Sequence, residues 1–243
     1  MAKFLLQVLG IAYLESRFIK RQPTWILQGF LSAIGFTMLL YVWGSIEALK
    51  NLVIAYIITG AWGLGLNIVA QSIGWDKIYK GFEYRVASPV TLPIYFAGMV
   101  LGSSPFLITD IVPALVVALI FKMNLLLLLT LIPLAGLALI LGAFLSLSIV
   151  LRIEERTNIS AITNPLYTLT ITLPPVYYPL YVLPEPIRSL TLLLPSVSLM
   201  ELARWITGYA KTSYHPLIPS LVLAVWTIIT TILVVRKFKW GLR

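Results

Sequence analysis

The sequence predicts an all-α integral membrane protein: six transmembrane helices, an N-terminal amphipathic interfacial helix, and a re-entrant helical hairpin between the fifth and sixth spans. Of the 243 residues, 59% are hydrophobic and 11% are charged, whereas soluble domains carry about 25% charged residues. Several apolar runs reach the length of about 20 residues that a spanning helix needs. One further stretch, ITLPPVYYPLYVLPEP (171–186), is apolar but too rich in proline for a continuous helix.

The first segment, 1–22, is expected to lie along the membrane interface. Its basic cluster follows the apolar run and no small-residue cleavage site appears, which is the reverse of a signal peptide. On a helical projection, Phe4 and Val8 fall on one side, whereas Lys3 and Gln7 fall on the other. The alternative is a disordered basic tail.

Six runs are predicted to span the membrane within a single domain covering 1–243. They are 24–43, 52–73, 93–121, 125–151, 157–183 and 216–235. Pro23 precedes the first run, at a position where a helix tolerates proline. The segment 184–204 contains an apolar core, 187–200, that is too short to span, and a re-entrant hairpin is therefore expected there.

The distribution of basic residues predicts the orientation. The formal net charge of +9 would suggest nucleic acid as a partner of a soluble protein, but in a membrane protein it marks the cytoplasmic face. With both termini on one side, the opposite side holds only Lys50, Lys122, Arg188, Arg204 and Lys211 of the 18 Lys and Arg residues. Both termini are therefore predicted to be cytoplasmic, and no nucleic-acid partner is expected.

The proline-rich stretch is predicted to close the external end of the molecule. Pro174, Pro175 and Pro179 each remove a backbone donor and break the preceding helical turn. Such backbone is tolerated at membrane depth only where protein buries it or where it lines a watery cavity. One interpretation is an external cap over a translocation path, and the other is a kinked helix that ends in an external loop. Glu201 and Arg204 could pair at i, i+3 and anchor the segment.

A short cytoplasmic loop, WDKIYKGFEYRVASPVTLP (75–93), could dock into a partner. The residues Asp76 to Val86 could form about three helical turns that stop before Pro89. The alternative is a solvated connector, and the same two interpretations apply to RIEERTN (152–158).

No motif for catalysis is found. The sequence lacks GxxxxGK[ST], HExxH, GxSxG and cysteine, and has a single histidine, His215. The chain is therefore predicted not to be an enzyme and to hold no metal or cofactor. Asp110 is the one acid within a predicted span, where an acid is a functional candidate. Its structural alternatives are to satisfy backbone groups freed by Pro105 and Pro113, or to lie near the external surface.

Small residues could allow close helix contacts in two spans. They are Gly98 and Gly102 in the third span, and Ala138, Gly142 and Ser146 in the fourth. Because such patterns are common in apolar sequence, they identify no particular interface.

Two segments resemble the permeases of ABC-2 type transporters. In YKGFEYRVASPVT, the positions Gly81, Glu83, Pro89 and Thr91 match the cytoplasmic loop of that family, whereas Phe82 stands where threonine is usual. The second segment is YYPLYVLPEPIRSLTLLLPSVSLMELAR (177–204), in which Leu194 replaces a usual asparagine. Its matching positions are Pro179, Leu183, Pro184, Pro195, Glu201 and Arg204.

The resemblance implies a plasma-membrane permease that pairs with a second copy or a close paralogue. ATP and Mg would be bound by a separate cytoplasmic ATPase subunit, and the cargo would be an amphipathic drug, lipid or glycan that is exported. The loop that couples to the ATPase would comprise Lys80, Gly81, Phe82, Glu83, Tyr84, Arg85 and Pro89, and the external cap Pro174, Pro175, Pro179, Pro184, Pro195, Glu201 and Arg204. The alternative is an ATP-independent channel or secondary transporter that uses Asp110.

Overall fold

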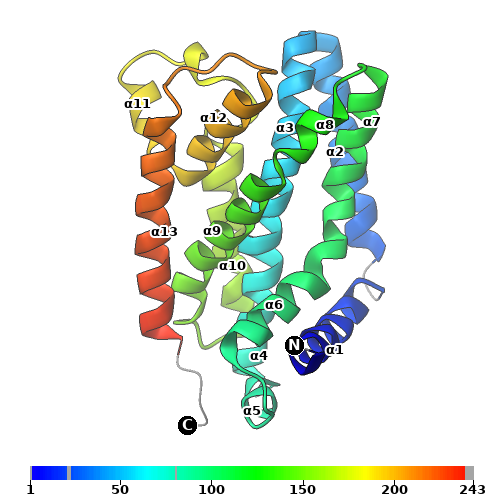
Figure 1. The fold of residues 1–243 in the computed structure, drawn as a ribbon, viewed down its shortest axis with the longest axis vertical. Coiled ribbons are helices and arrows are strands. Elements are labelled where there is room, and N and C mark those ends of the chain that lie inside the picture. The colour runs from blue at the N-terminus through cyan, green and yellow to red at the C-terminus, as the bar shows by residue number, and fades with distance from the viewer. Residues whose placement is uncertain (1, 21–22, 80, 239–243) are drawn as a thin grey trace.

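The computed structural model describes residues 2–20, 23–79 and 81–238, and every regular element in these ranges is helical (Figure 1). The elements, in chain order, are α1 (Ala2–Lys20), α2 (Pro23–Trp43), α3 (Ile46–Gly63), η1 (Leu64–Val69), α4 (Ala70–Ile78), α5 (Gly81–Val86), α6 (Leu92–Ser103), η2 (Ser104–Leu107), α7 (Ile108–Ile120), α8 (Leu125–Leu129), α9 (Ile132–Val150), α10 (Arg156–Tyr167), η3 (Thr168–Thr172), η4 (Leu180–Val182), α11 (Ile187–Leu192), α12 (Pro195–Thr207) and α13 (Leu217–Lys237).

Within the described residues, five helices are long and apolar enough to cross a membrane, which supports the predicted membrane-embedded, all-helical class. They are Pro23–Trp43, Ile46–Ile78, Leu92–Ile120, Leu125–Val150 and Leu217–Lys237. The second of them is longer than the predicted run 52–73, because the Ser45 side chain caps its start and polar residues continue it beyond the apolar core. It therefore includes the acids Glu47 and Asp76 as well.

The predicted fifth span, 157–183, is a shorter helix than expected. The 12-residue α10 continues directly into the five-residue η3 and ends at Thr172. This helix is about 25 Å long, which is less than the hydrocarbon thickness of about 30 Å. It ends there because Pro174 and Pro175 supply no N–H group to continue the helical ladder.

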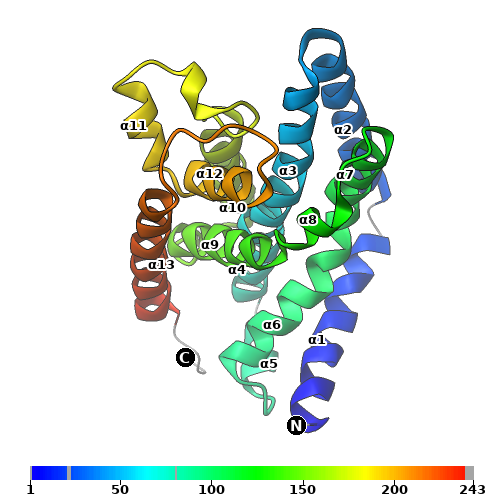
Figure 2. The same ribbon diagram turned by 45° about the horizontal axis from the view of Figure 1, so that its top comes forward.

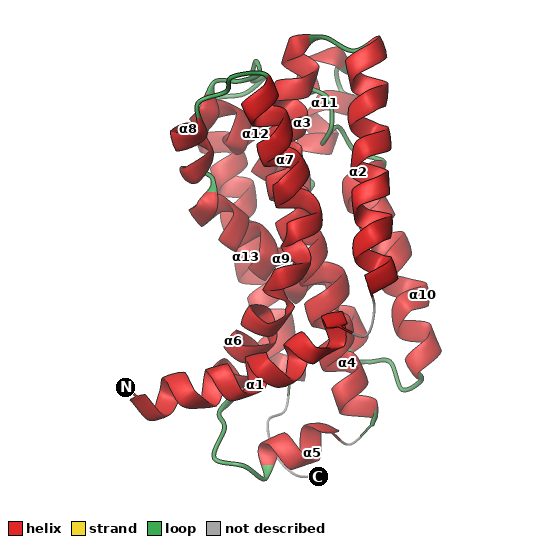
Figure 3. Ribbon diagram, turned by 90° about the vertical axis from the view of Figure 1, so that its right-hand side faces the viewer, coloured by secondary structure: helices red, strands yellow, loops and turns green. Residues whose placement is uncertain are grey.

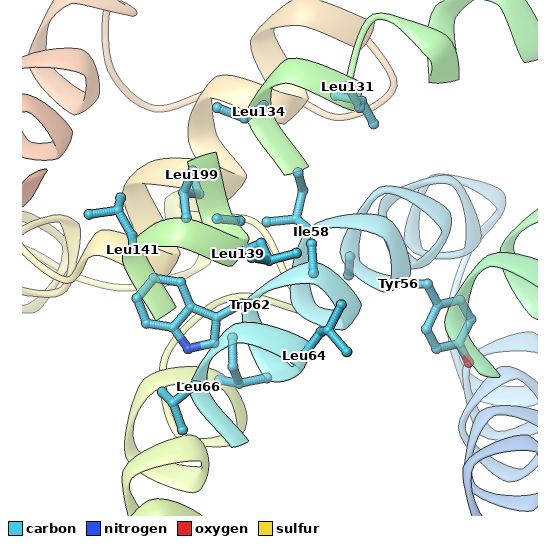
Figure 4. Close-up of a cluster of buried hydrophobic side chains, with 14 of the residues drawn as sticks. Tyr56, Ile58, Trp62, Leu64, Leu66, Leu131, Leu134, Leu139, Leu141 and Leu199 are labelled. Atoms are coloured by element: carbon cyan, nitrogen blue, oxygen red, sulfur yellow. The ribbon is translucent and has the colours of Figure 1, made fainter. Parts of the chain in front are cut away.

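The helix made of α3, η1 and α4 forms the centre of the molecule. In the most apolar 18-residue stretch of this helix, 78% of the residues are buried. The corresponding share in α2 is 6%, and only Ala33 is buried there. Trp62 of the central helix is fully buried and lies beside Leu139 and Leu141 of α9 (Figure 4). The backbones approach closely at this crossing, because a Cβ atom at Gly142 would lie 2.5 Å from the carbonyl oxygen of Trp62.

The two ends of the molecule differ. In Figure 1, α5 and the end of α13 lie at the lower end, and Figure 3 shows α1 running across that end rather than along the long helices. Figure 2 turns the upper end forward and shows α11 and α12 there, near the start of α13. Val8 and Ile11 of α1 are buried against α6, where a Cβ atom at Gly98 would lie 2.6 Å from the Cβ atom of Ile11. The small residues of the third span therefore hold α1.

We expect Gly142→Ala to lower the free energy of unfolding by about 1–3 kcal/mol, since the added methyl group would overlap the backbone of the central helix. Thermal unfolding of the purified protein in detergent measures this effect. Gly136→Ala in the same helix is the matched control, because nothing lies within 4 Å of the added Cβ atom. Equal melting temperatures for the two variants would contradict the close approach.

Candidate functional site

The predicted site residues fall in three separate regions. The proline-rich stretch and α12 lie at the upper end, and α5 lies at the lower end (Figure 1). Asp110 lies between these ends, in the first turn of α7. The structure thus does not gather them into one site, and each region has its own geometry.

At the upper end, the guanidinium of Arg204 binds the broken backbone. Arg204 is fully buried, and its Nη2 donates to the carbonyl oxygens of Pro175 (3.3 Å), Val176 (2.8 Å) and Tyr178 (2.9 Å). These carbonyl groups lie just after η3, where the prolines prevent the helix from continuing. They therefore have no N–H donors from a following helical turn. The fixed fork of an Arg side chain carries five N–H donors, and it can therefore satisfy several acceptors at once.

Glu201 and Asn51 complete this network. The predicted i, i+3 pair forms, with 2.9 Å between Arg204 Nη1 and Glu201 Oε1. Glu201 Oε2 accepts from the backbone N–H of Ser213 at 2.9 Å, which ties the loop before α13 to α12. Arg204 Nε donates to Asn51 Oδ1 at 2.8 Å, and Asn51 Nδ2 donates to the carbonyl oxygen of Tyr177 at 2.7 Å. The network therefore joins α12, the proline-rich stretch and the central helix.

The remaining residues of the predicted cap have structural positions. Pro174 and Pro175 are buried, and Pro195 occupies the first turn of α12. The carbonyl oxygen of Pro184 accepts from the N–H of Arg188 at 3.1 Å, and Pro179 directly precedes η4. Asn51 was not predicted from the sequence, because a single asparagine at the head of an apolar run carries no signal of a partner 153 residues away.

We expect Arg204→Met to lower the free energy of unfolding by about 3–5 kcal/mol, because it leaves Glu201 buried without its partner and the carbonyl groups without donors. Arg204→Lys should recover only part of this loss, since an ammonium group lacks the planar fork. Chemical unfolding in mixed micelles measures the effect, and Arg152→Met, at an exposed position, is the control. Full recovery by lysine would show that charge alone matters.

At the lower end, α5 is fixed to the helices on either side by Arg85. Its Nη2 lies 2.8 Å from Asp76 Oδ2, which also accepts from the hydroxyl of Tyr95 at 2.7 Å. The guanidinium carbon lies 4.9 Å from the centroid of the Tyr95 ring, and Nη1 lies 3.2 Å from Met99 Sδ. Arg85 thus ties α5 both to α4 and to α6.

The outward face of α5 carries exposed side chains. Glu83 is exposed, and the side chain of Tyr84 is 81% exposed. Pro89 is exposed as well, and its carbonyl oxygen accepts from Gln7 Nε2 of α1 at 3.0 Å. The helix is shorter than the predicted Asp76–Val86, because Asp76 belongs to α4 and α5 begins only at Gly81. Lys80 and the side chain of Phe82 lie outside the described residues.

The two predicted cytoplasmic loops are linked to each other. The Nη1 of Arg156 donates to the hydroxyl of Tyr79 at 2.7 Å. Its guanidinium carbon lies 5.0 Å from the Trp75 ring and 5.1 Å from the Tyr79 ring, within the range of cation–π attraction. The start of α10 is thereby joined to the end of α4.

Glu15 of α1 extends the polar cluster at this end. A Cβ atom at Gly102 would lie 2.5 Å from the Cβ atom of Glu15, so the base of this side chain lies against α6. Burial raises the pKa of Glu15 above its ordinary value of 4.5, the Ser72 hydroxyl lowers it, the nearby Asp76 raises it further, and Arg85 opposes that rise. The carboxyl groups of Glu15 and Asp76 therefore share one environment, which the sequence did not indicate.

We expect the stability of the protein to fall as pH rises from about 4.5, because the raised pKa of Glu15 means that the folded state binds a proton more tightly than the unfolded state. Above the folded pKa the loss is complete and constant. Glu15→Gln should be more stable than wild type at neutral pH and show a weaker pH dependence, because burial also raises the pKa of Asp76 and that contribution remains. Melting temperatures measured across pH test this, with Glu83→Gln on the exposed face as control, and parallel profiles for wild type and Glu15→Gln would contradict it.

Asp110 lines a cavity in the middle of the molecule. Its Oδ2 accepts from the hydroxyl of Thr109 at 3.0 Å, and no bond to a freed backbone group is found within the described part of the chain. A Cβ atom at Gly29 would lie 2.8 Å from the Cβ atom of Thr109, which places Thr109 against the second turn of α2. The contact at Gly29 lies about 10 Å from the start of α2, and Asp110 is therefore nearer to the lower end of that helix than to its upper end. Asp110 therefore lies toward the end of the bundle that α1 crosses, not toward the end formed by α11 and α12.

Comparisons with known proteins add no identification. A scan against family models and a search of curated proteins each find no match to this chain. Among the described residues, no group of three His, Cys, Asp or Glu side chains is arranged to hold a metal ion. The functional interpretation therefore depends on the geometry of the three regions and on the sequence resemblance.

Proposed function

We propose that this chain is the membrane-spanning subunit of an ABC transporter that exports an amphipathic substrate, such as a drug, lipid or glycan. In this proposal two copies, or this chain and a close paralogue, pair in the plasma membrane to form the pathway. A separate cytoplasmic subunit binds ATP and Mg and hydrolyses the nucleotide. Five crossings would be the long apolar helices, and α10 with η3 and the stretch that follows would complete a sixth, with both termini cytoplasmic.

The observation that carries the proposal is the geometry of α5. It projects beyond the ends of the long helices, it is fixed by the Arg85–Asp76 ion pair, and it exposes Glu83 and Tyr84 (Figure 1). An element that must transmit force from a partner needs a rigid attachment on one side and free side chains on the other. A solvated connector needs neither, and this geometry therefore favours the docking interpretation.

The central helix supplies a path for the movement. Asp76 near its lower end contacts α5 through Arg85, and Asn51 near its upper end contacts Arg204 and the external cap. A push on α5 would therefore reach the external end through one helix and two polar networks, without crossing a flexible loop. In this mechanism nucleotide-driven closure of the ATPases tilts the central helix, and the cap opens.

The second candidate function is an ATP-independent channel or secondary transporter. The cavity beside Asp110 favours it, because a carboxylate within a span is by default a site for an ion, a proton or a substrate. A pH-driven flux in liposomes that contain this chain alone, and that is lost in Asp110→Asn, would establish this function. ATP-dependent transport that requires a second protein would exclude it.

We expect the double variant Glu83→Ala, Tyr84→Ala to lose at least about tenfold in the amount of ATPase that co-purifies from native membranes, as truncating a docking hot spot does. Nucleotide hydrolysis in the eluate measures the partner. Tyr41→Ala removes an aromatic side chain that is 67% exposed on α2, away from α5, and serves as the control. Undiminished hydrolysis in the double variant, or ATP-stimulated transport after scrambling 76–88, would overturn the proposal.

A further inference from the structure

A cavity of about 200 Å³ lies between α2, the central helix, the η2–α7 segment and α10. Its lining combines polar and aromatic residues: Thr59, Asn67, Thr109 and Asp110 with Trp25, Phe106 and Tyr167. Because Thr109 packs against the second turn of α2, the cavity lies in the half of the membrane nearer to α1. Trp25 is 46% exposed, so the cavity reaches the outer surface of the bundle beside α2.

The described lining offers hydrogen-bond acceptors and one carboxyl group, and it contains no positively charged side chain. No Lys or Arg belongs to its described residues, and Asp110 forms no ion pair with any described residue. The Oδ1 of Asn67 is buried and has no hydrogen-bond partner among the described residues, which is costly unless a ligand supplies a donor. The hydroxyl of Thr59 donates to the carbonyl oxygen of Ala55 at 2.7 Å, and its own oxygen can still accept.

Two departures from regular α-helix contribute residues to this cavity, and a third begins directly after the lining residue Tyr167. Asn67 belongs to the π-helical η1, Phe106 belongs to the 3₁₀-helical η2, and Tyr167 directly precedes the π-helical η3. Single turns of π-helix inside α-helices occur frequently at functional sites. The presence of η1 and η2 in the lining, with η3 directly beside it, indicates that the cavity is a built feature of the fold.

We infer that this cavity binds the protonated amine head of an amphipathic molecule. Asp110 supplies the countercharge, Asn67 Oδ1 accepts an N–H of the ammonium group, and the face of Trp25 adds cation–π attraction at the mouth. The apolar tail then lies along the outer surface beside α2. The inference names the class of substrate for the transporter proposed above, and in taking this ligand as cargo it rests on that proposal.

The experiment measures binding of radiolabelled 2-phenylethylammonium by equilibrium dialysis against the full chain in phosphatidylcholine nanodiscs, with empty nanodiscs subtracted. The neutral 2-phenylethanol has nearly the same size. We expect the amine to bind at least about tenfold more tightly than the alcohol, and Asp110→Asn to lose at least about tenfold in affinity for the amine, because a charge-assisted contact is lost.

Asn67→Leu separates a ligand site from a structural role. It replaces a buried acceptor without a partner by an apolar group of similar size, so the variant should fold at least as well as wild type and still bind the amine several-fold more weakly. Glu154→Gln, at an exposed position, is the control for the loss of an acid.

Equal affinity for the amine and the alcohol, or unchanged binding of the amine by Asp110→Asn, would overturn the inference. No ATPase is present in this experiment. A chain that binds the amine but has no ATPase partner would therefore refute the transporter proposal alone, and a chain that has the partner but does not bind the amine would refute the site alone.

Discussion

The structure depends on one constraint: the backbone between Thr172 and Ile187 cannot form a continuous helix, yet it lies in a chain whose solvent is lipid. Every carbonyl group buried there must find a donor within the protein. Arg204 supplies donors to three of them while it is itself neutralised by Glu201 and held by Asn51. Burying the guanidinium of Arg204 alone would carry a prohibitive desolvation cost. Its ion pair and hydrogen bonds offset that cost, and they also hold the segments of the upper end together.

The same helix that receives this network also receives the lower one. Ile46–Ile78 is the most buried of the five long helices, and it carries Asn51 near one end and Asp76 near the other. Around the middle of its length it is crossed by α9, where glycine brings the two backbones together. The two networks that contain ion pairs thus lie at the ends of this helix, whereas its backbone is tightly packed against α9 between them. In the proposed transporter, this division would let the two ends respond to partners while the crossing keeps its shape.

The sequence predicted the long helices well, because an apolar run of spanning length has few alternatives in lipid. It also predicted the Glu201–Arg204 pair, since i, i+3 spacing places both on one face of a helix. It could not predict Asn51 or Tyr95 as partners, because contacts between distant segments leave no local pattern. The helix predicted over Asp76–Val86 is divided between the end of α4 and α5, since propensity does not locate a break within a polar loop. The fifth run was predicted to continue to 183, although its prolines allow a helix only to Thr172.

The sparse attachment of α2 has an energetic consequence. Its inner side is held by contacts such as Tyr56 with the carbonyl oxygen of Ala33 and Thr109 with Gly29, and its outer side faces the hydrocarbon. Acyl chains solvate that outer side equally well wherever the helix stands, so displacing α2 forfeits only the few inner contacts. In the transporter that we propose, α2 would therefore serve as a lateral gate through which a molecule dissolved in one leaflet enters the protein without first passing through water.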